Sequence, residues 1–101
     1  MRVITGTARG RKLITLEGND VRPTTDMVKE AIFSIIQFDV PGSVFLDLFS
    51  GSGQMGIEAL SRGAKFGYFV DNSKKSVDVT TENLKNVGFD SNSKCYLMDA
   101  K

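Results

Sequence analysis

A glycine-rich segment is the part of the sequence whose residue types most directly suggest chemistry. Residues 51–56 read Gly-Ser-Gly-Gln-Met-Gly, which matches the pattern G-x-G-x-x-G. An apolar run precedes this segment, and apolar residues at helical spacing follow it. A glycine-rich turn between a strand and a helix lets the backbone approach a ligand, and the first N–H groups of the helix face that ligand. The segment therefore predicts a ligand-binding loop, the alternative being a tight turn that binds nothing.

Three carboxylates are expected at the carboxyl ends of successive strands. Asp47 lies four residues before Gly51, Asp71 ends a second apolar run twenty residues after Gly51, and Asp99 ends a third run. In a parallel sheet these ends share one edge, where open α/β folds bind their ligands. We therefore predict that the three acids and the glycine loop form one site.

Asp47 separates two classes of adenosine-containing ligand. An acid in the position of Asp71 accepts hydrogen bonds from ribose hydroxyls in both classes, so it does not discriminate between them. A carboxylate at Asp47 would repel the pyrophosphate of a dinucleotide such as NAD but attract the sulfonium and ammonium groups of S-adenosylmethionine. The residues therefore favour S-adenosylmethionine as the cofactor. The structural alternative is a carboxylate that only caps nearby backbone N–H groups.

The elements that must hold these residues alternate along the chain. Short apolar runs predict three strands, at residues 44–49, 66–70 and 94–98. Helical spacing of apolar residues predicts the two connecting helices, at residues 54–62 and 73–88. Strands joined by helices pair in parallel, so the β-α-β-α-β order predicts an α/β fold, the first half of a Rossmann-like doubly wound sheet. The first run has the composition of a central strand that is buried on both faces.

The N-terminal part of the chain predicts a β-hairpin and a helix. Residues 2–5 and 12–16 are β-rich runs separated by a basic tip that contains glycine. Apolar residues between Met27 and Ile36 recur at helical spacing and form one stripe. We accordingly divide the chain into an N-terminal extension, residues 1–42, and a cofactor-binding half, residues 43–101.

Positive charge is concentrated at the N-terminus. The whole chain has 13 Lys+Arg and 12 Asp+Glu, a formal charge of +1, but residues 1–12 contain four basic side chains and no acid. Clustered basic residues gain affinity for polyanions because they displace counterions from phosphates. This cluster predicts contact with RNA, and the alternative is an ordinary solvated hairpin. Its members are Arg2, Arg9, Arg11 and Lys12.

Composition excludes several classes of protein. The chain has no histidine and one cysteine, so it cannot build a His-based triad, a zinc cluster or an internal disulfide. We expect no metal and a reducing, cytoplasmic location. No apolar run approaches the roughly 20 residues that cross a bilayer, so no membrane partner is expected. Cys95 lies inside the third apolar run, which favours a small core residue over a nucleophile.

Three segments together resemble a known family. Residues 47–53 read DLFSGSG, residues 22–26 read RPTTD, and the basic hairpin precedes both. Over the whole chain they resemble the bacterial small-subunit ribosomal RNA guanine-N2 methyltransferases. The resemblance implies methyl transfer from S-adenosylmethionine to RNA, with ribosomal RNA or the small-subunit particle as partner. The implied cofactor-binding residues are Asp47, Phe49, Ser50, Gly51, Gly53, Asp71, Asn72, Asp99, Ala100, Arg22 and Thr24.

One feature of that family is missing. Its members carry an Asn/Asp-Pro-Pro-Tyr motif after the fourth strand, whereas the prolines of this chain are Pro23 and Pro41. We therefore expect no catalytic residue in this segment, a fragment or truncated form of the enzyme that is inactive alone, and an exposed sheet edge through which it self-associates. An NAD-type dinucleotide module and a noncatalytic RNA-binding protein remain the alternatives.

Overall fold

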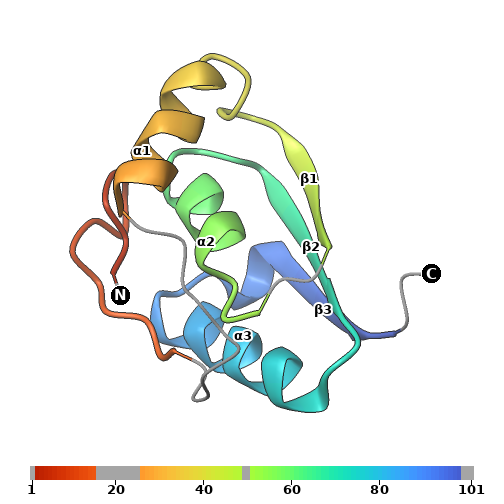
Figure 1. The fold of residues 1–101 in the computed structure, drawn as a ribbon. Coiled ribbons are helices and arrows are strands. Elements are labelled where there is room, and N and C mark those ends of the chain that lie inside the picture. Colours follow the sequence, from red (N-terminus) through yellow and green to blue (C-terminus); the bar gives the residue numbers. More distant parts are fainter. Residues whose placement is uncertain (1, 16–25, 49–50, 99–101) are drawn as a thin grey trace.

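A three-stranded parallel sheet with helices on one face forms the centre of the computed structural model, which describes residues 2–15, 26–48 and 51–98 (Figure 1). The strands lie in the order β1-β2-β3 and are β1 (Val44–Leu48), β2 (Phe66–Asp71) and β3 (Ser93–Leu97). The helices are α1 (Asp26–Ile35), α2 (Gln54–Ser61) and α3 (Lys74–Asn86), with a short 3₁₀ turn at Asp90–Asn92. The predicted β-α-β-α-β order and α/β class are confirmed.

Local sequence signals explain where the connecting helices begin and end. The Ser73 side chain accepts a hydrogen bond from the Ser76 backbone N–H at 3.4 Å, as expected of an N-cap residue. Gly63 and Gly88 follow α2 and α3 with φ of 106° and 84°. Glycine adopts this left-handed conformation without steric cost, so both helices stop close to where the sequence predicts.

The core lies between α2, α3 and the sheet, and two glycines allow the close packing there. A Cβ atom on Gly56 would lie 2.3 Å from the Phe69 ring, and one on Gly67 would lie 2.3 Å from the Phe45 ring. These two rings meet edge to face, with centroids 5.6 Å apart. The last glycine of the G-x-G-x-x-G pattern therefore serves helix–sheet packing in this chain.

The N-terminal hairpin is much less regular than predicted. Its two arms meet at one antiparallel bridge, between Arg2 and Lys12, and residues 2–15 contain no strand. The reason is competition for backbone groups. The N–H groups of Ile4 and Thr5 donate to Glu58 on α2, and Ile14 exchanges hydrogen bonds with Asn83 on α3. The segment is therefore tied to the helices, and its own pairing is limited: the Val3 N–H donates to the Arg11 carbonyl oxygen at 3.0 Å and the Gly10 N–H donates to the Val3 carbonyl oxygen at 2.9 Å.

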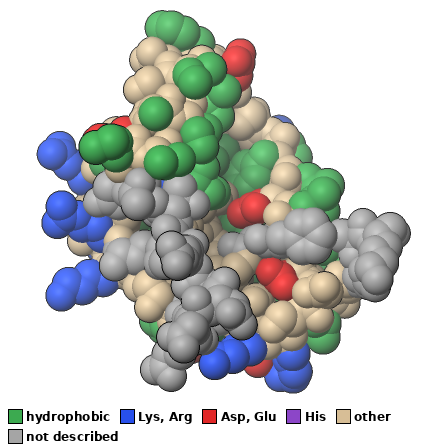
Figure 2. Space-filling model, viewed as in Figure 1, with side chains coloured by type: hydrophobic (Ala, Val, Ile, Leu, Met, Phe, Trp, Pro, Cys, Tyr) green, Lys and Arg blue, Asp and Glu red, His purple; other side chains and the backbone are tan. Residues whose placement is uncertain are grey.

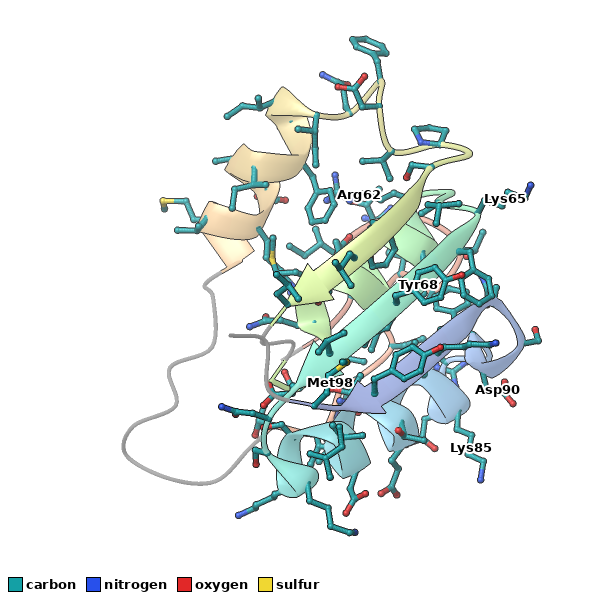
Figure 3. The ribbon with its side chains drawn as sticks, turned by 90° about the vertical axis from the view of Figure 1, so that its right-hand side faces the viewer. Arg62, Lys65, Tyr68, Lys85, Asp90 and Met98 are labelled. Atoms are coloured by element: carbon teal, nitrogen blue, oxygen red, sulfur yellow. The ribbon has the colours of Figure 1, made fainter. Side chains whose placement is uncertain are left out.

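The second face of the sheet carries no helix in the described part of the chain, which corrects the expectation that β1 is buried on both faces. Figure 3 looks onto this face, where Tyr68 is labelled. The side chains of Val44, Leu46 and Leu48 are 59%, 60% and 49% exposed. β1 is also an edge strand in the described sheet. The apolar composition of β1 is thus real, but the described residues cover only one of its faces.

The apolar stripe of α1 is also turned outward. The helix forms where predicted, but Met27 and Ile35 are 80% and 82% exposed, and among the α1 side chains that the structure describes the buried ones are Lys29 and Phe33. Lys29 faces α2, where its Nζ lies 3.6 Å from Glu58 Oε1. This buried ion pair fixes the rotation of α1 and leaves the stripe uncovered.

Candidate functional site

The glycine loop connects β1 to α2 at the carboxyl edge of the sheet. Gly51 and Gly53 both have positive φ, 58° and 82°, and Gly53 is the N-cap residue of α2. A Cβ atom on Gly53 would lie 2.9 Å from Thr80 Cγ2 on α3. Backbone conformation and space therefore both favour glycine at position 53.

Two polar side chains of α3 hold the carbonyl groups of this loop. Thr80 Oγ1 donates to the Gly51 carbonyl oxygen at 2.7 Å, and Asn83 Nδ2 donates to the Ser52 carbonyl oxygen at 2.9 Å. Sequence reasoning missed Asn83. The available signal was an amide beside Leu84 on the buried side of the helix, since a buried amide must have partners nearby.

Asp71 makes hydrogen bonds to the glycine loop and to the N-cap residue of α3. Its side chain is buried, and its Oδ2 and Oδ1 accept hydrogen bonds from the backbone N–H groups of Gly51 and Ser73, each at 3.0 Å. A carboxylate has about four acceptor positions, so these two bonds leave capacity for further donors such as ribose hydroxyls. The exposed Asn72 follows directly.

Asp47 is a carboxylate whose hydrogen-bonding capacity is only partly used. It lies on β1 opposite Phe69 of β2. Burial raises the pKa of Asp47 to about 6; a hydrogen bond from the Gly56 backbone N–H lowers it, and the charge of Asp71 raises it. Among the described residues, none donates to its buried Oδ2. A cationic ligand beside the glycine loop would supply the missing partner and favour the charged form.

The structure thus brings four of the predicted site residues together at one edge: Asp47, Gly51, Gly53 and Asp71. Asn72 lies beside them. The remaining predicted cofactor residues fall outside the described part of the chain, and their roles stay predictions; they are Arg22, Thr24, Phe49, Ser50, Asp99 and Ala100.

The basic cluster lies on the other side of α2 and α3 from the sheet. Arg2, Arg9, Arg11 and Lys12 are all exposed, and basic side chains gather along this side of the molecule (Figure 2). One guanidinium is also anchored, because Arg11 Nη2 donates to the Asn86 carbonyl oxygen at the end of α3. The cluster is therefore accessible and attached to the helix that holds the glycine loop.

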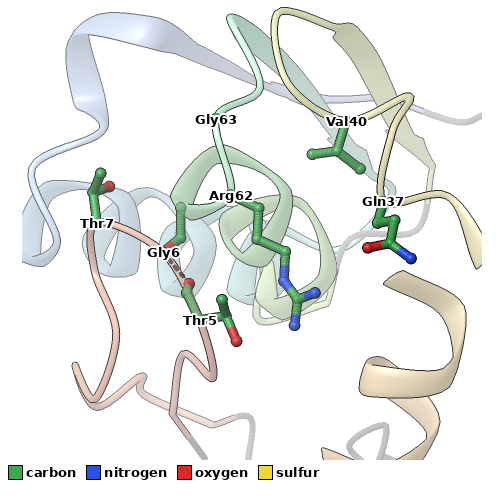
Figure 4. A pocket seen from close by; sticks show the side chains of 8 residues that line it. Thr5, Gly6, Thr7, Gln37, Val40, Arg62 and Gly63 are labelled. Carbon is green, nitrogen blue, oxygen red and sulfur yellow. Dashed lines mark hydrogen bonds between the residues drawn. The ribbon is translucent and has the colours of Figure 1, made fainter. Parts of the chain in front are cut away.

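A hollow of about 560 Å³ lies at the opposite end of α2 from the glycine loop (Figure 4). Residues 5–7 and 61–63 line it together with Gln37 and Val40. Arg62 donates to Glu58 at 2.9 Å, and its guanidinium lies 4.6 Å above the centre of the Phe33 ring. Both contacts hold the Arg62 side chain against other residues of the fold. The hollow is separate from the predicted cofactor edge.

Two further expectations concern reactive groups and membranes. Cys95 is partly buried, and burial raises the pKa of its thiol although a hydrogen bond with Thr81 lowers it, which is the reverse of an activated nucleophile. In the part of the chain that the structure describes, no group of acidic or cysteine side chains could hold a metal ion, and none of the helices has the length and apolar character to span a membrane.

Comparison with known proteins gives consistent matches. The family model described as "Conserved hypothetical protein 95" matches residues 1–101. A candidate rRNA methyltransferase of Bacillus subtilis (strain 168), YlbH, is 46% identical over 101 residues, covering 100% of this chain and 55% of that protein. Ribosomal RNA small subunit methyltransferase D of Haemophilus influenzae is 42% identical over 85 residues, covering 84% and 44%.

Solved structures agree with the sequence matches. The structure of a candidate methyltransferase of Escherichia coli, yhhF, superposes with a TM-score of 0.89 at 34% identity, covering 99% of this chain and 54% of that one. The chain spans about half the length of the relatives it matches.

Proposed function

Because this chain belongs to the family described as Conserved hypothetical protein 95, we propose that it forms the cofactor-binding half of an S-adenosylmethionine-dependent methyltransferase that acts on ribosomal RNA. Relatives named as ribosomal RNA methyltransferases support the reaction class. The finer proposal is transfer to the exocyclic N2 of a guanine, in the cytoplasm. The exposed basic cluster and the glycine loop on one scaffold support an RNA substrate over a dinucleotide-dependent reaction.

One observation carries the cofactor proposal: the buried Oδ2 of Asp47 has no donor among the described residues and lies beside the glycine loop. S-adenosylmethionine supplies a methyl group on a positively charged sulfur and also carries an ammonium group. A carboxylate at Asp47 attracts both charges, whereas it repels a pyrophosphate. In this assignment Asp47 favours the cationic end of the cofactor, Asp71 accepts from the ribose hydroxyls, and Gly51 and Gly53 let the backbone approach.

The described residues position the cofactor and leave the chemistry on RNA to other groups. Methyl transfer to an amine needs alignment of nitrogen, methyl and sulfur, together with acceptors for the amine protons. We propose that these acceptors lie outside this segment. The separation of an extension, residues 1–42, from a cofactor half, residues 43–101, also remains a proposal, although Val3, Leu13 and Phe33 pack in the same core as Ile57 and Leu84.

Asp71→Asn tests the ribose contact. We expect this change to weaken S-adenosylhomocysteine binding by at least about 1 kcal/mol, or about fivefold, because a neutral amide oxygen accepts more weakly than a carboxylate and because the amide NH2 replaces one of the oxygens that accept from Gly51 and Ser73. Isothermal titration calorimetry of the full-length protein measures the affinity. Asp78→Asn makes the same chemical change at an exposed position on α3 and is the control. Equal affinity in wild type and Asp71→Asn would remove Asp71 from the cofactor site, and preferential binding of NAD would reject the proposed cofactor.

The basic cluster makes a separate prediction about RNA. Replacing Arg9, Arg11 and Lys12 with alanine should weaken binding to a small-subunit ribosomal RNA fragment and reduce the slope of log affinity against log salt by about 0.7–0.9 for each phosphate that the variant no longer neutralises. Fluorescence anisotropy at several salt concentrations measures this slope. Replacing Lys74, Lys75 and Lys85 on α3 with alanine removes the same formal charge elsewhere. If both triple variants keep the wild-type slope, the cluster is ordinary solvated surface.

A further inference from the structure

Asn83 makes hydrogen bonds to two segments that are far apart in the sequence. Its side chain is fully buried on α3. Nδ2 donates to the carbonyl oxygens of Ile14 and Ser52, each at 2.9 Å, and Oδ1 accepts from the Ile14 backbone N–H at 2.6 Å. One amide therefore connects the N-terminal segment, which carries the basic cluster, to the glycine loop of the candidate cofactor site.

The chemistry of the amide makes these contacts interdependent. An asparagine amide has two N–H donors, and Asn83 uses one on each segment. Because the group is buried, a partner that moves away leaves a donor or acceptor without a hydrogen bond, at a cost of about 1–3 kcal/mol. A shift of the Ser52 carbonyl thus favours a compensating shift of Asn83. Asn83 is in turn hydrogen-bonded to both the N–H and the carbonyl group of Ile14.

Two neighbouring side chains, Thr80 and Glu58, differ from Asn83 in the segments to which they are hydrogen-bonded. Thr80 donates to the Gly51 carbonyl oxygen of the loop. Glu58 accepts from the N–H groups of Ile4 and Thr5 at the other end of the N-terminal segment. Through these bonds Thr80 holds the loop and Glu58 holds the segment, whereas Asn83 holds both. Thr80 therefore offers a matched control on the loop side.

We propose that Asn83 is a positioning residue that couples the cofactor loop to the basic N-terminal segment, an inference that rests on the proposed cofactor site. A ligand that orders the loop at Ser52 also orders the segment at Ile14. By thermodynamic linkage, RNA bound to the basic segment strengthens cofactor binding by the same factor by which the cofactor strengthens RNA binding.

Hydrogen exchange at the Ile14 amide tests the coupling without any activity measurement. The experiment uses the full-length protein with and without saturating S-adenosylhomocysteine, whose binding is measured separately by calorimetry. In wild type we expect the ligand to slow exchange at Ile14 by about fivefold or more. Asn83→Asp keeps an acceptor for the Ile14 N–H but removes both donors, so ligand-dependent protection at Ile14 should disappear. Thr80→Val should retain that protection, because it leaves the hydrogen bonds of Asn83 to Ile14 and Ser52 in place.

The outcomes separate this inference from the proposed function. Absence of S-adenosylhomocysteine binding to wild type contradicts the cofactor site itself. Binding that leaves Ile14 exchange in wild type unchanged overturns the coupling and leaves the cofactor site intact. Equal protection in wild type and Asn83→Asp also overturns the role of Asn83. Should Asn83→Asp fail to fold, Asn83→Ala removes the acceptor for the Ile14 N–H as well as both donors and should likewise abolish ligand-dependent protection, and the wild-type measurement remains decisive.

Discussion

Replacing Glu58 with alanine should lower the free energy of unfolding by about 3–5 kcal/mol, because it leaves a buried charge without its partner. The side chains of Glu58 and Lys29 are both 0% exposed, with Nζ and Oε1 3.6 Å apart. Glu58 also accepts hydrogen bonds from the backbone N–H groups of Ile4 and Thr5. Its loss therefore removes support from α1 and from the N-terminal segment together. Chemical denaturation measures the change.

The reciprocal substitution provides the control for this prediction. Lys29→Met leaves Glu58 bonded to Arg62 and to the two backbone N–H groups, so we expect a clearly smaller loss of stability. A thioether chain also fills much of the space of a lysine stem. Equal losses of stability in Glu58→Ala and Lys29→Met would show that Glu58 stabilises the fold through Lys29 alone and not through its other hydrogen bonds. A loss below about 1 kcal/mol in Glu58→Ala would contradict the buried-charge argument.

The uncovered sheet face should make the 101-residue chain self-associate when it is studied alone. β1 is an edge of the described sheet, and Val44, Leu46 and Leu48 expose apolar side chains along it. Unpaired edges with few charges recruit further strands. We expect sedimentation to show dimers or larger species, and Leu46→Lys to weaken association by about 100-fold, equivalent to about 3 kcal/mol, because a lysine would be buried without a partner.

A control substitution and a direct observation decide the second prediction. Glu82→Lys raises the net charge by two units, against one unit for Leu46→Lys, on the exposed side of α3 and away from the sheet face, and should still leave association unchanged. A folded wild-type monomer at all concentrations would contradict the prediction. Equal dissociation caused by Leu46→Lys and Glu82→Lys would show that net charge, not the sheet face, controls association.

Sequence reasoning located the elements well because their signals are local. The alternation of apolar runs with helical spacing predicted β1 to β3 and the connecting helices, and Ser73 and Gly88 marked the limits of α3. These features depend on a few neighbouring residues, so no knowledge of tertiary contacts was required. The grouping of Asp47, Asp71 and the glycine loop followed from parallel topology alone.

The errors concern contacts between distant residues. The hairpin was predicted from its own composition, but the N–H groups of Ile4, Thr5 and Ile14 donate to Glu58 and Asn83, which lie more than fifty positions further along the chain. The apolar stripe of α1 was expected to be the buried face of that helix. In the structure Lys29 is buried against Glu58, and the apolar stripe is exposed. Periodicity reports which residues share a face, but it does not identify the partner that will cover the face.

The cofactor claim is tested most directly by titrating S-adenosylmethionine into the full-length wild-type protein across the pH range around the pKa of Asp47. That pKa is raised to about 6 in the structure, and a bound cation favours the ionised form. Affinity should therefore fall as pH falls through about 6, by about tenfold between one unit above and one unit below that value. The Asp47→Asn variant should bind more weakly and without this dependence. A wild-type affinity that does not change with pH, or an Asp47→Asn affinity equal to that of wild type, would contradict the account.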